Sequence, residues 1–250
     1  MSTVERFSDR VENYVKFRPG YPPEVLQLFR NEMGLTADSV IVDVGSGTGI
    51  SAKVFLENGN TVYGVEPNSA MRSAAEEWLG GFPEFRSLNG TAEATGLPED
   101  SVDFVIAAQA FHWFDRDNAR EEFLRILKPG GWVALIWNER QLNSTPFLRE
   151  YEQFLLKFAT DYAKVRHENV DREPLKLFFR NEFRTRVFSN SQVLDFNGLL
   201  GRVLSSSYMP NESSGQFSDM KNELSAIVAK HAENGKIEIL YDTAVHYSQF

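Results

Sequence analysis

The stretch S-V-I-V-D-V-G-S-G-T-G-I, from Ser39 to Ile50, decides the fold of this chain. Its first part, residues 40–44, is β-branched apart from Asp43, which is typical of a buried parallel strand. Three glycines at alternate positions follow it: Gly45, Gly47 and Gly49. Apolar residues at helical spacing then continue toward Leu56. Such a strand, turn and helix start predict an anion or nucleotide site, because glycine admits a ligand to the backbone and the helix start offers free N–H groups.

The composition is that of a globular protein with an acidic balance. The 250 residues are 42% hydrophobic and 24% charged, which suits one large α/β domain or a domain with a cap. Acidic residues outnumber basic ones by 35 to 26, so the net charge is −9. This disfavours a nucleic-acid substrate, since a groove that follows phosphates usually carries a basic excess. The absence of cysteine excludes disulfides, thiolate catalysis and cysteine-metal sites, and we expect no metal.

The N-terminal residues and the length of the apolar runs indicate the cellular location of the protein. The opening residues M-S-T-V-E-R-F-S-D-R are too charged for a secretory signal, and the longest apolar run, residues 132–137, is far short of a membrane span. We therefore expect a cytoplasmic protein, a monomer or homodimer, with no membrane segment.

Strand and helix patterns alternate on both sides of the glycine turn. A helix is predicted over 23–33 before it; strands over 61–65, 84–88, 101–108 and 132–137 follow, with helices over 68–79 and 115–127. The run K-P-G-G at 128–131 indicates a sharp stop. This alternation predicts a doubly wound parallel sheet.

After residue 138 the regular alternation of predicted strands and helices changes. Helices are predicted over 146–162, 191–204 and 217–231, with a strand over 183–188. Residues 236–247 alternate between apolar and polar, which predicts a half-buried antiparallel strand at or near the sheet edge.

The spacing of residues around the turn reduces the number of ligand classes that fit it. No Lys-Ser/Thr pair follows the glycines, which excludes a P-loop. The third glycine stands two positions after Gly47, whereas the dinucleotide fingerprint places it at the third, so an NAD(P)-dependent oxidoreductase is disfavoured but stays an alternative. Glu66 closes the second strand 17 residues after Gly49, where a carboxylate can accept hydrogen bonds from both ribose hydroxyls.

Four further segments carry a resemblance to a known family. They are N-G-T-A-E at 89–93, L-P-E-D-S-V-D at 97–103, A-Q-A-F-H-W-F at 108–114 and L-K-P-G-G at 127–131. Together with V-D-V-G-S-G-T-G they resemble class I S-adenosylmethionine-dependent methyltransferases of the small-molecule type. The resemblance is close over 38–138. The N-terminal F-x-x-R-V-x-x-Y-x-x-x-R-P-G-Y-P segment and the region 205–208 are similar to the branch related to trans-aconitate methyltransferases.

The resemblance implies an α/β, Rossmann-like, doubly wound, seven-stranded and mostly parallel sheet with an antiparallel last strand and a helical cap. We expect an N-terminal helical segment over the cofactor at 1–34, the cofactor-binding core at 35–140, and a substrate cap with the last strands at 141–250.

The implied cofactor is S-adenosylmethionine, and its contacts can be assigned by position. The residues that match the methionine end are Tyr14, Arg18, Asp43, Gly45, Ser46, Gly47, Gly49 and Gln109. Glu66 matches the ribose acid, and the residues around the adenine are Pro67, Asn68, Thr91, Ala92 and Glu93. Many relatives have an aspartate where Thr91 stands, so the adenine contact there is expected to be weaker.

The resemblance implies transfer of a methyl group to a small organic acceptor, for which a carboxylic acid is one class. A carboxylate needs no base; for a hydroxyl or amine, His112 is the candidate base. Trp113, Trp137 and Tyr208 are candidates to line the acceptor pocket. The arginines that could pair with an acidic acceptor are Arg166, Arg172, Arg180 and Arg184. A non-catalytic S-adenosylmethionine-binding protein remains an alternative, while no N-P-P-Y-like motif or basic appendage supports a nucleic-acid methyltransferase.

Overall fold

Helices and strands alternate through most of the first half of the chain, and several of the elements after residue 126 are longer than those before it. The computed structural model describes residues 11–160, 172–180, 182–206 and 208–250, without the side chains of residues 11, 12 and 172. The elements are α1 (Val11–Phe17), α2 (Pro23–Glu32), β1 (Val40–Val44), α3 (Ile50–Leu56), β2 (Thr61–Val65), α4 (Ser69–Trp78), β3 (Phe85–Leu88), β4 (Val102–Ala108), the 3-10 helix η2 (Phe111–Trp113), α5 (Arg116–Ile126), β5 (Leu127–Arg140), α6 (Pro146–Phe158), α8 (Arg172–Phe179), β6 (Arg184–Leu194), α9 (Phe196–Leu204), α10 (Phe217–His231) and β7 (Ile237–Gln249).

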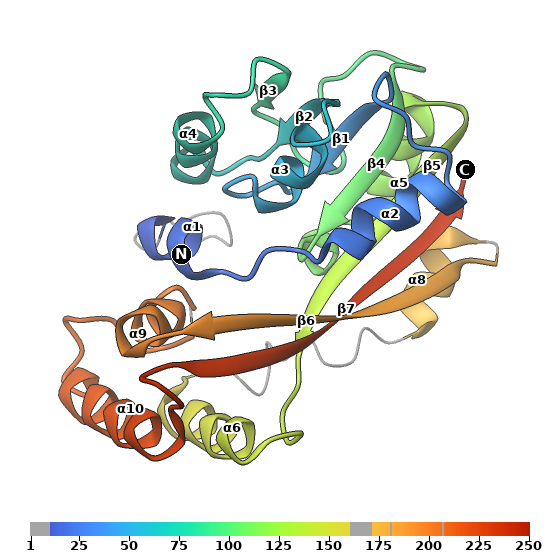
Figure 1. Cartoon of the computed structure of the whole chain (residues 1–250). Helices are drawn as coiled ribbons and strands as arrows, with labels where there is room; N and C mark the ends of the chain where they lie inside the picture. Colours follow the sequence, from blue (N-terminus) through green and yellow to red (C-terminus); the bar gives the residue numbers. More distant parts are fainter. Residues whose placement is uncertain (1–10, 161–171, 181, 207) are drawn as a thin grey trace.

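Seven strands form one sheet in the order β3-β2-β1-β4-β5-β7-β6 (Figure 1). The strands from β1 to β5 are parallel, and β7 is antiparallel to both β5 and β6. The predicted seven-stranded, mostly parallel sheet with an antiparallel last strand is confirmed. The chain runs outward from β1 in one direction and from β4 in the other, so the carboxyl ends of these two strands form the switch point at which open α/β sheets bind ligands.

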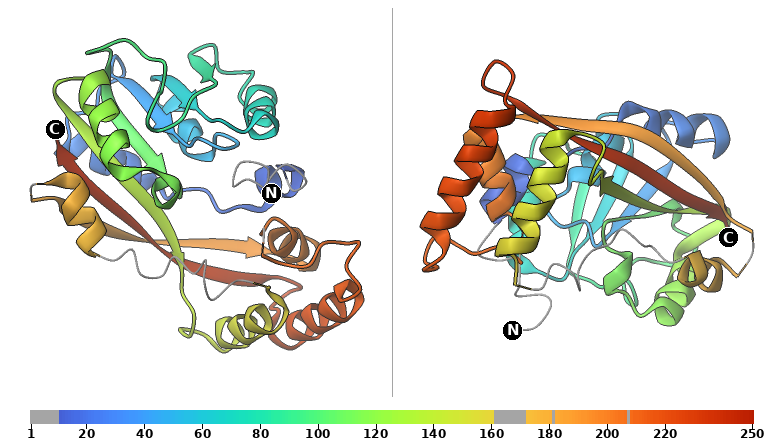
Figure 2. Two further views of the ribbon diagram at one scale, coloured as in Figure 1. Left: turned by 180° about the vertical axis from the view of Figure 1, so that it is seen from behind. Right: turned by 90° about the horizontal axis from the view of Figure 1, so that it is seen from below.

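Apolar side chains cover both faces of the sheet. On one face α2 and α3 pack through Phe29, whose ring lies 4.9 Å from Phe55 and 5.7 Å from Phe104 on β4. On the other face Phe178 of α8 packs against Phe111 of η2, with ring centroids 4.8 Å apart, and against Phe123 of α5 at 6.0 Å. Figure 2 shows α5 and α8 together on the side seen from behind. With both faces covered, the apolar β1 sequence is explained.

The edge strand is longer than predicted. β7 lies near the sheet edge, as expected, and β6 is the edge strand beside it, extending from residue 184 to 194 rather than stopping at 188. The predicted helix over 191–204 accordingly begins only at Phe196. The run S-N-S-Q at 189–192 has little strand preference of its own, but pairing with β7 along the whole of β6 outweighs this. The predicted antiparallel stripe is confirmed, because every second residue from Ile237 to Tyr247 is buried.

Two other element boundaries differ from the prediction, and one helix is additional. β5 includes the K-P-G-G run. Leu127 pairs with Val102 of β4, and after an irregularity in the register Trp132 pairs with Phe104, so the strand begins before the run. α6 ends at Phe158 instead of continuing to 162, and residues 161–162 lie outside the described ranges. The helix α8 was not predicted.

Where the paired strands β6 and β7 extend past the end of β5, they carry a third apolar cluster with α6, α9 and α10 (Figure 1). α1 lies between this group, which we call the cap, and α4 of the sheet. Its last residue, Phe17, packs on Gly201 of α9 so closely that a Cβ at position 201 would stand 2.2 Å from the ring. The N-terminal helix therefore joins the cap to the sheet. Within the described parts of the chain, we find no helix with the length and apolar content needed to cross a bilayer.

Candidate functional site

The glycine turn after β1 is fixed to the end of β2 by its own backbone. The amide of Gly45 donates to the carbonyl oxygen of Val65 (2.8 Å), and that of Gly47 donates to Oε2 of Glu66 (3.0 Å). All three glycines have positive φ values, namely 68°, 55° and 86° for Gly45, Gly47 and Gly49. Only glycine adopts this conformation at low cost, so the sequence G-S-G-T-G specifies the turn.

The three glycines differ in what surrounds them. A Cβ on Gly45 would lie 2.6 Å from Cβ of Ala110, and one on Gly49 would lie 2.5 Å from Cδ1 of Leu79. A Cβ on Gly47 would meet no atom within 4 Å. Gly45 and Gly49 are therefore packing positions, whereas Gly47 faces open space in which a ligand can approach the backbone.

Glu66 stands at the end of β2 with both carboxylate oxygens placed by backbone amides. Oε1 accepts from the amide of Asn68 (2.8 Å) and Oε2 from that of Gly47. Burial raises the pKa of Glu66, and these two amide contacts oppose the rise. Nη1 of Arg72 also donates to the carbonyl oxygen of Glu66 (2.9 Å). Each carboxylate oxygen keeps a second lone pair, so the group can accept from a vicinal diol.

Asp43, on β1, has one oxygen in use and one left over. Its side chain is fully buried, Oδ2 accepts from Oγ of Ser51 (2.5 Å), and Oδ1 has no hydrogen-bond partner among the described residues. Burial raises the pKa of Asp43 to about 7. A buried, unpartnered acceptor beside an open glycine fits a ligand with a cationic or N–H group, and with Glu66 it fits the aminoacyl and ribose parts of S-adenosylmethionine.

Gln109 directly follows β4 on the other side of the switch point. It has a positive φ of 58°, a conformation that non-glycine residues adopt rarely and mostly at functional sites. Its Nε2 donates to the carbonyl oxygen of Asn138 on β5 (3.1 Å), and Nδ2 of Asn138 donates to that of Gly20 (3.0 Å). These contacts fasten the chain between α1 and α2 to the edge of the sheet where the glycine turn lies.

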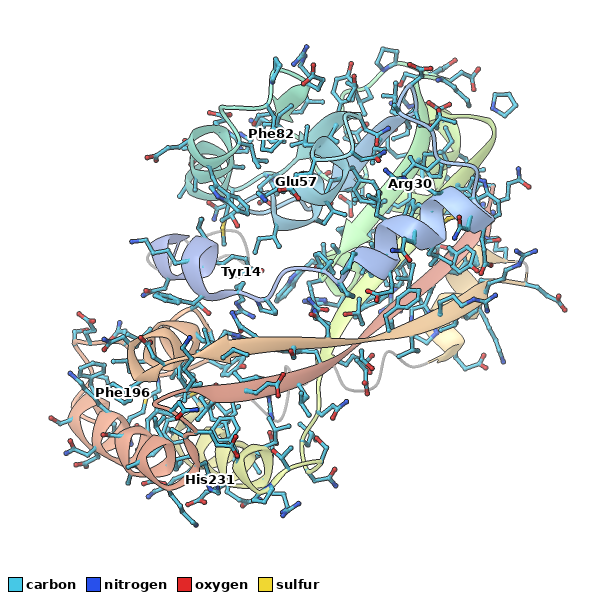
Figure 3. All side chains as sticks on the ribbon, viewed as in Figure 1. Tyr14, Arg30, Glu57, Phe82, Phe196 and His231 are labelled. Carbon is cyan, nitrogen blue, oxygen red and sulfur yellow. The ribbon has the colours of Figure 1, made fainter. Side chains whose placement is uncertain are left out.

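The N-terminal segment reaches the same edge. The guanidinium of Arg18 lies over the ring of Tyr14 at 4.7 Å, and Figure 3 shows Tyr14 on α1, between the sheet and the cap. Burial raises the pKa of Tyr21 well above its usual range, and the nearby Tyr14 and Asp43 raise it further. Together with the Asn138–Gly20 hydrogen bond, this influence of Asp43 puts the segment that contains Arg18 at the sheet edge that carries the glycine turn.

The segment after β3 is less closely joined to the turn. Thr91 is exposed, Ala92 packs into the core, and Oε1 of Glu93 accepts from the amide of Asp115 (2.8 Å). Gly90 has no room for a side chain, since a Cβ would lie 2.9 Å from the carbonyl oxygen of Ala94. The adenine contacts assigned to this segment stay a prediction.

The residues predicted to contact the methyl acceptor lie in different parts of the structure. His112 lies on η2 with its ring centroid 4.5 Å from that of Trp113, which is 43% exposed. Trp137 is in the core, 2% exposed, with its ring edge-on to Phe111. Tyr208 lies near Arg18 in the cap. Their roles stay predictions.

Of the four arginines suggested for an acidic acceptor, two have side chains that the structure describes. Arg180 and Arg184 are exposed and pair with Asp117 and Glu32, respectively. Arg166 lies outside the described residues, as does the side chain of Arg172. Among the described side chains no group of three or more His, Asp and Glu residues could hold a metal ion.

Sequence reasoning missed Arg202, Tyr21 and Asn138. Arg202 lies in the last turn of α9, whose sequence F-N-G-L-L-G-R-V-L is otherwise apolar apart from one asparagine. A single cation in such a helix, three residues before the Ser205–Tyr208 region, was a usable signal.

Asn68 offers a test of how the helix start supports Glu66. Oδ1 of Asn68 caps α4 by accepting from the amides of Ala70 (2.9 Å) and Met71 (3.1 Å), and its own amide holds Glu66. We expect Asn68→Ala to lower the free energy of unfolding by about 1 kcal/mol and to weaken nucleoside binding, both measurable by urea titration and calorimetry.

Thr145→Ala is the matched control, because Thr145 caps α6 in the cap by accepting from the amide of Leu148 (3.1 Å). It should lose a similar amount of stability and leave ligand affinity unchanged. Equal affinities of the two variants would show that the start of α4 does not position Glu66.

Comparison with known proteins gives one family and several relatives. Residues 42–135 match the family model described as a methyltransferase domain. An uncharacterised methyltransferase of Schizosaccharomyces pombe is 32% identical over 152 residues, which are 60% of this chain and 59% of that protein. One of Mycobacterium tuberculosis is 37% identical over 134 residues, 54% of this chain and 52% of that protein. The chain thus spans between a half and three fifths of the length of these curated relatives.

Solved structures share the fold. A structure described as a type II methyltransferase from Anaeromyxobacter dehalogenans superposes with a TM-score of 0.64 at 21% identity, over 93% of this chain and 98% of that one. A phosphoethanolamine N-methyltransferase 2 of Haemonchus contortus gives 0.56 at 15% identity, over 97% of this chain and 57% of that one. The seven-stranded sheet with its antiparallel β7 is common to this fold.

Proposed function

We propose that this chain transfers a methyl group from S-adenosylmethionine to a small organic acid, because residues 42–135 match the methyltransferase-domain model and the sheet shares the fold of solved methyltransferases. The observation that carries the proposal is the turn itself, where an open Gly47 stands between the buried, unpartnered oxygen of Asp43 and the carboxylate of Glu66.

Each residue of the turn has a role toward the cofactor. Glu66 accepts from the ribose hydroxyls, Asp43 accepts from the ammonium group, and the bare backbone at Gly47 allows close approach. When bound, the cofactor supplies an activated methyl group on a sulfonium. The protein then aligns the acceptor for in-line displacement and excludes water, which is where its contribution to the rate lies.

The acid class of the acceptor rests on the resemblance of the N-terminal segment and of 205–208 to the trans-aconitate methyltransferase branch. A carboxylate oxygen is nucleophilic without a base, so this reaction demands nothing of His112. Were the methylated group a hydroxyl or amine, His112 would be the base. Trp113, Trp137 and Tyr208 are proposed as acceptor contacts, and residues 141–250 as the substrate cap. A cytoplasmic monomer or homodimer that acts on no nucleic acid completes the proposal.

The pKa of Asp43 makes cofactor binding depend on pH. The carboxyl holds its proton up to about pH 7 in the free protein, and a cationic ligand favours the ionised form. Binding should therefore release a proton below pH 7, and affinity should rise by up to about tenfold per pH unit before it levels off above 7. Because the raised pKa belongs to the folded state, the stability of the free protein should in turn fall as pH rises from about 4 to 7.

Asp43→Asn removes this titration. Calorimetry in two buffers of different ionisation enthalpy counts the protons released, and the difference between the wild-type and variant pH profiles isolates Asp43 from titration of the ligand itself. Identical slopes in the two proteins would contradict the assignment.

Release of S-adenosylhomocysteine from a panel of small acids, phenols and amines tests the activity. We expect turnover with acids. Turnover with tRNA or DNA alone would contradict the small-molecule proposal, and cofactor binding without any turnover across the panel would favour a non-catalytic binding protein.

A further inference from the structure

Two arginines from distant parts of the chain converge on the same turn of the cap. Nη2 of Arg18 donates to the carbonyl oxygen of Ser205 (3.1 Å), and Nη1 of Arg202 donates to Oγ of Ser206 (3.3 Å). Ser205 caps α9 and Ser206 is 2% exposed, so both guanidinium groups sit against a buried turn. Burial lowers the pKa of Arg18, and the neighbouring Arg202 guanidinium lowers it further. Burial also acts to lower the pKa of Arg202, but the surrounding phenols, above all Tyr241 with its hydrogen bond, raise it above its usual value.

No carboxylate neutralises this pair within the described residues. The groups that face Arg18 and Arg202 are phenols, namely those of Tyr14, Tyr151, Tyr208 and Tyr241. Other arginines of the chain have acidic partners: Arg140 pairs with Glu152 in the same cap, and Arg186 pairs with Glu32. In a chain with 35 acidic and 26 basic residues, an acid-free pair of cations is a specific arrangement.

Each of the two guanidinium groups also has one N–H group, at Nε, without an acceptor in the described part of the chain. The Nε atoms of Arg18 and Arg202 are buried and have no hydrogen-bond partner among the residues that the structure describes. A buried N–H without an acceptor is unfavourable, and a guanidinium fork matches the two oxygens of a carboxylate or phosphate. The pair is therefore arranged to receive an anion.

Hydrogen bonds join the segment that carries Arg18 to the sheet edge of the proposed methyl-transfer site. Nδ2 of Asn138 donates to the carbonyl oxygen of Gly20, and Nε2 of Gln109 donates to that of Asn138. Nδ2 of Asn190 on β6 donates to the carbonyl oxygen of Gly20 (2.9 Å), and Nε2 of Gln192 donates to that of Phe17 (2.9 Å). The segment 17–20 is thus fixed between the cap and the sheet, with Arg202 on its cap side.

We propose that Arg202 determines acceptor specificity by binding a carboxylate or phosphate group of the acceptor, with Arg18 beside it. This inference rests on the proposed function, and it replaces the arginines suggested from the sequence with one that the fold brings to the site. The anionic group so held is separate from the oxygen that receives the methyl group, so the acceptor carries at least one further acid group.

Structural roles account for part of the arrangement. A cation in the last turn of a helix is favoured by the helix dipole, and the ring of Tyr14 attracts the Arg18 guanidinium. Neither role requires two cations at one turn, and neither supplies an acceptor for the two Nε atoms. If Arg18 meets the carboxylate of the cofactor, as the resemblance implies, Arg202 is the one left for the acceptor.

Binding of matched probes tests the proposal without turnover. Succinate and glycerol phosphate, with neutral succinamide and glycerol as their counterparts, are titrated into the complex with S-adenosylhomocysteine at constant ionic strength. We expect one or both anions, and neither neutral counterpart, to bind the wild type saturably. Succinate alone would indicate a carboxylate, and glycerol phosphate alone a phosphate.

Substitution then assigns the binding to Arg202. Arg202→Gln should weaken the bound anion by about tenfold or more, Arg202→Lys should lose less, and Arg149→Gln on the exposed side of α6 should behave as wild type. Because the surrounding phenols raise the pKa of Arg202 in the folded protein, Arg202→Gln is expected to lower the melting temperature, so the readout is anion affinity at a temperature at which the variant is folded. A merely structural arginine would leave that affinity unchanged.

The outcomes separate the two proposals. This inference is overturned if Arg202→Gln still binds S-adenosylhomocysteine and its affinity for the anion is unchanged. It is also overturned if Arg202→Gln loses as much affinity for S-adenosylhomocysteine as Arg18→Gln does. Failure of the wild type to bind S-adenosylhomocysteine or S-adenosylmethionine overturns the proposed function instead.

Discussion

Replacing Glu66 with alanine is expected to weaken S-adenosylhomocysteine binding by about a hundredfold or more. The carboxylate accepts from the amides of Gly47 and Asn68 at 3.0 and 2.8 Å, and we propose that it accepts from the ribose hydroxyls. Alanine removes the ligand contacts and leaves two backbone amides of the turn without acceptors. Calorimetric titration of the purified variant measures the change.

Glu57→Ala provides the control, because Glu57 follows α3 and its carboxylate pairs only locally, with Lys53. It should bind as the wild type does. A Glu66→Ala protein that folds and keeps its affinity within a few-fold would remove Glu66 from the site.

Gly45→Ala is expected to be among the most destabilising single substitutions at the turn. The new Cβ would lie 2.6 Å from Cβ of Ala110, and the backbone φ of 68° is unfavourable for alanine. Overpacking of about 1–3 kcal/mol adds to a left-handed backbone cost of about 1–2 kcal/mol. Urea unfolding should therefore show a loss of about 2–5 kcal/mol, together with loss of cofactor binding.

Gly34→Ala separates the two contributions. Gly34 follows α2 with a φ of 71° and would meet no atom within 4 Å, so it carries the backbone cost alone, about 1–2 kcal/mol. Equal losses in the two variants would mean that Gly45 is not a close-packing position.

The sequence predicted what local patterns determine. The β1 strand, the glycine turn and Glu66 are coded within about thirty residues, and the fold places them together because parallel strands end at one edge of a sheet. The antiparallel β7 was predicted from its two-residue period, and its buried face follows that period.

Contacts between distant segments could not be predicted in the same way. β6 is polar and becomes a long edge strand only by pairing with β7, so its length and the position of α9 were wrong. Arg18 and Arg202 are 184 residues apart and meet because Phe17 packs on Gly201. Nothing in the local pattern of either segment indicates that partner.

The measurement that tests the central claim most directly is a calorimetric comparison of S-adenosylhomocysteine with NAD under the same conditions. The turn at Gly45–Gly49 predicts binding of one S-adenosylhomocysteine per chain, lost in Glu66→Ala, and no binding of NAD. Binding of NAD with none of S-adenosylhomocysteine would contradict the account and favour an oxidoreductase on the same sheet.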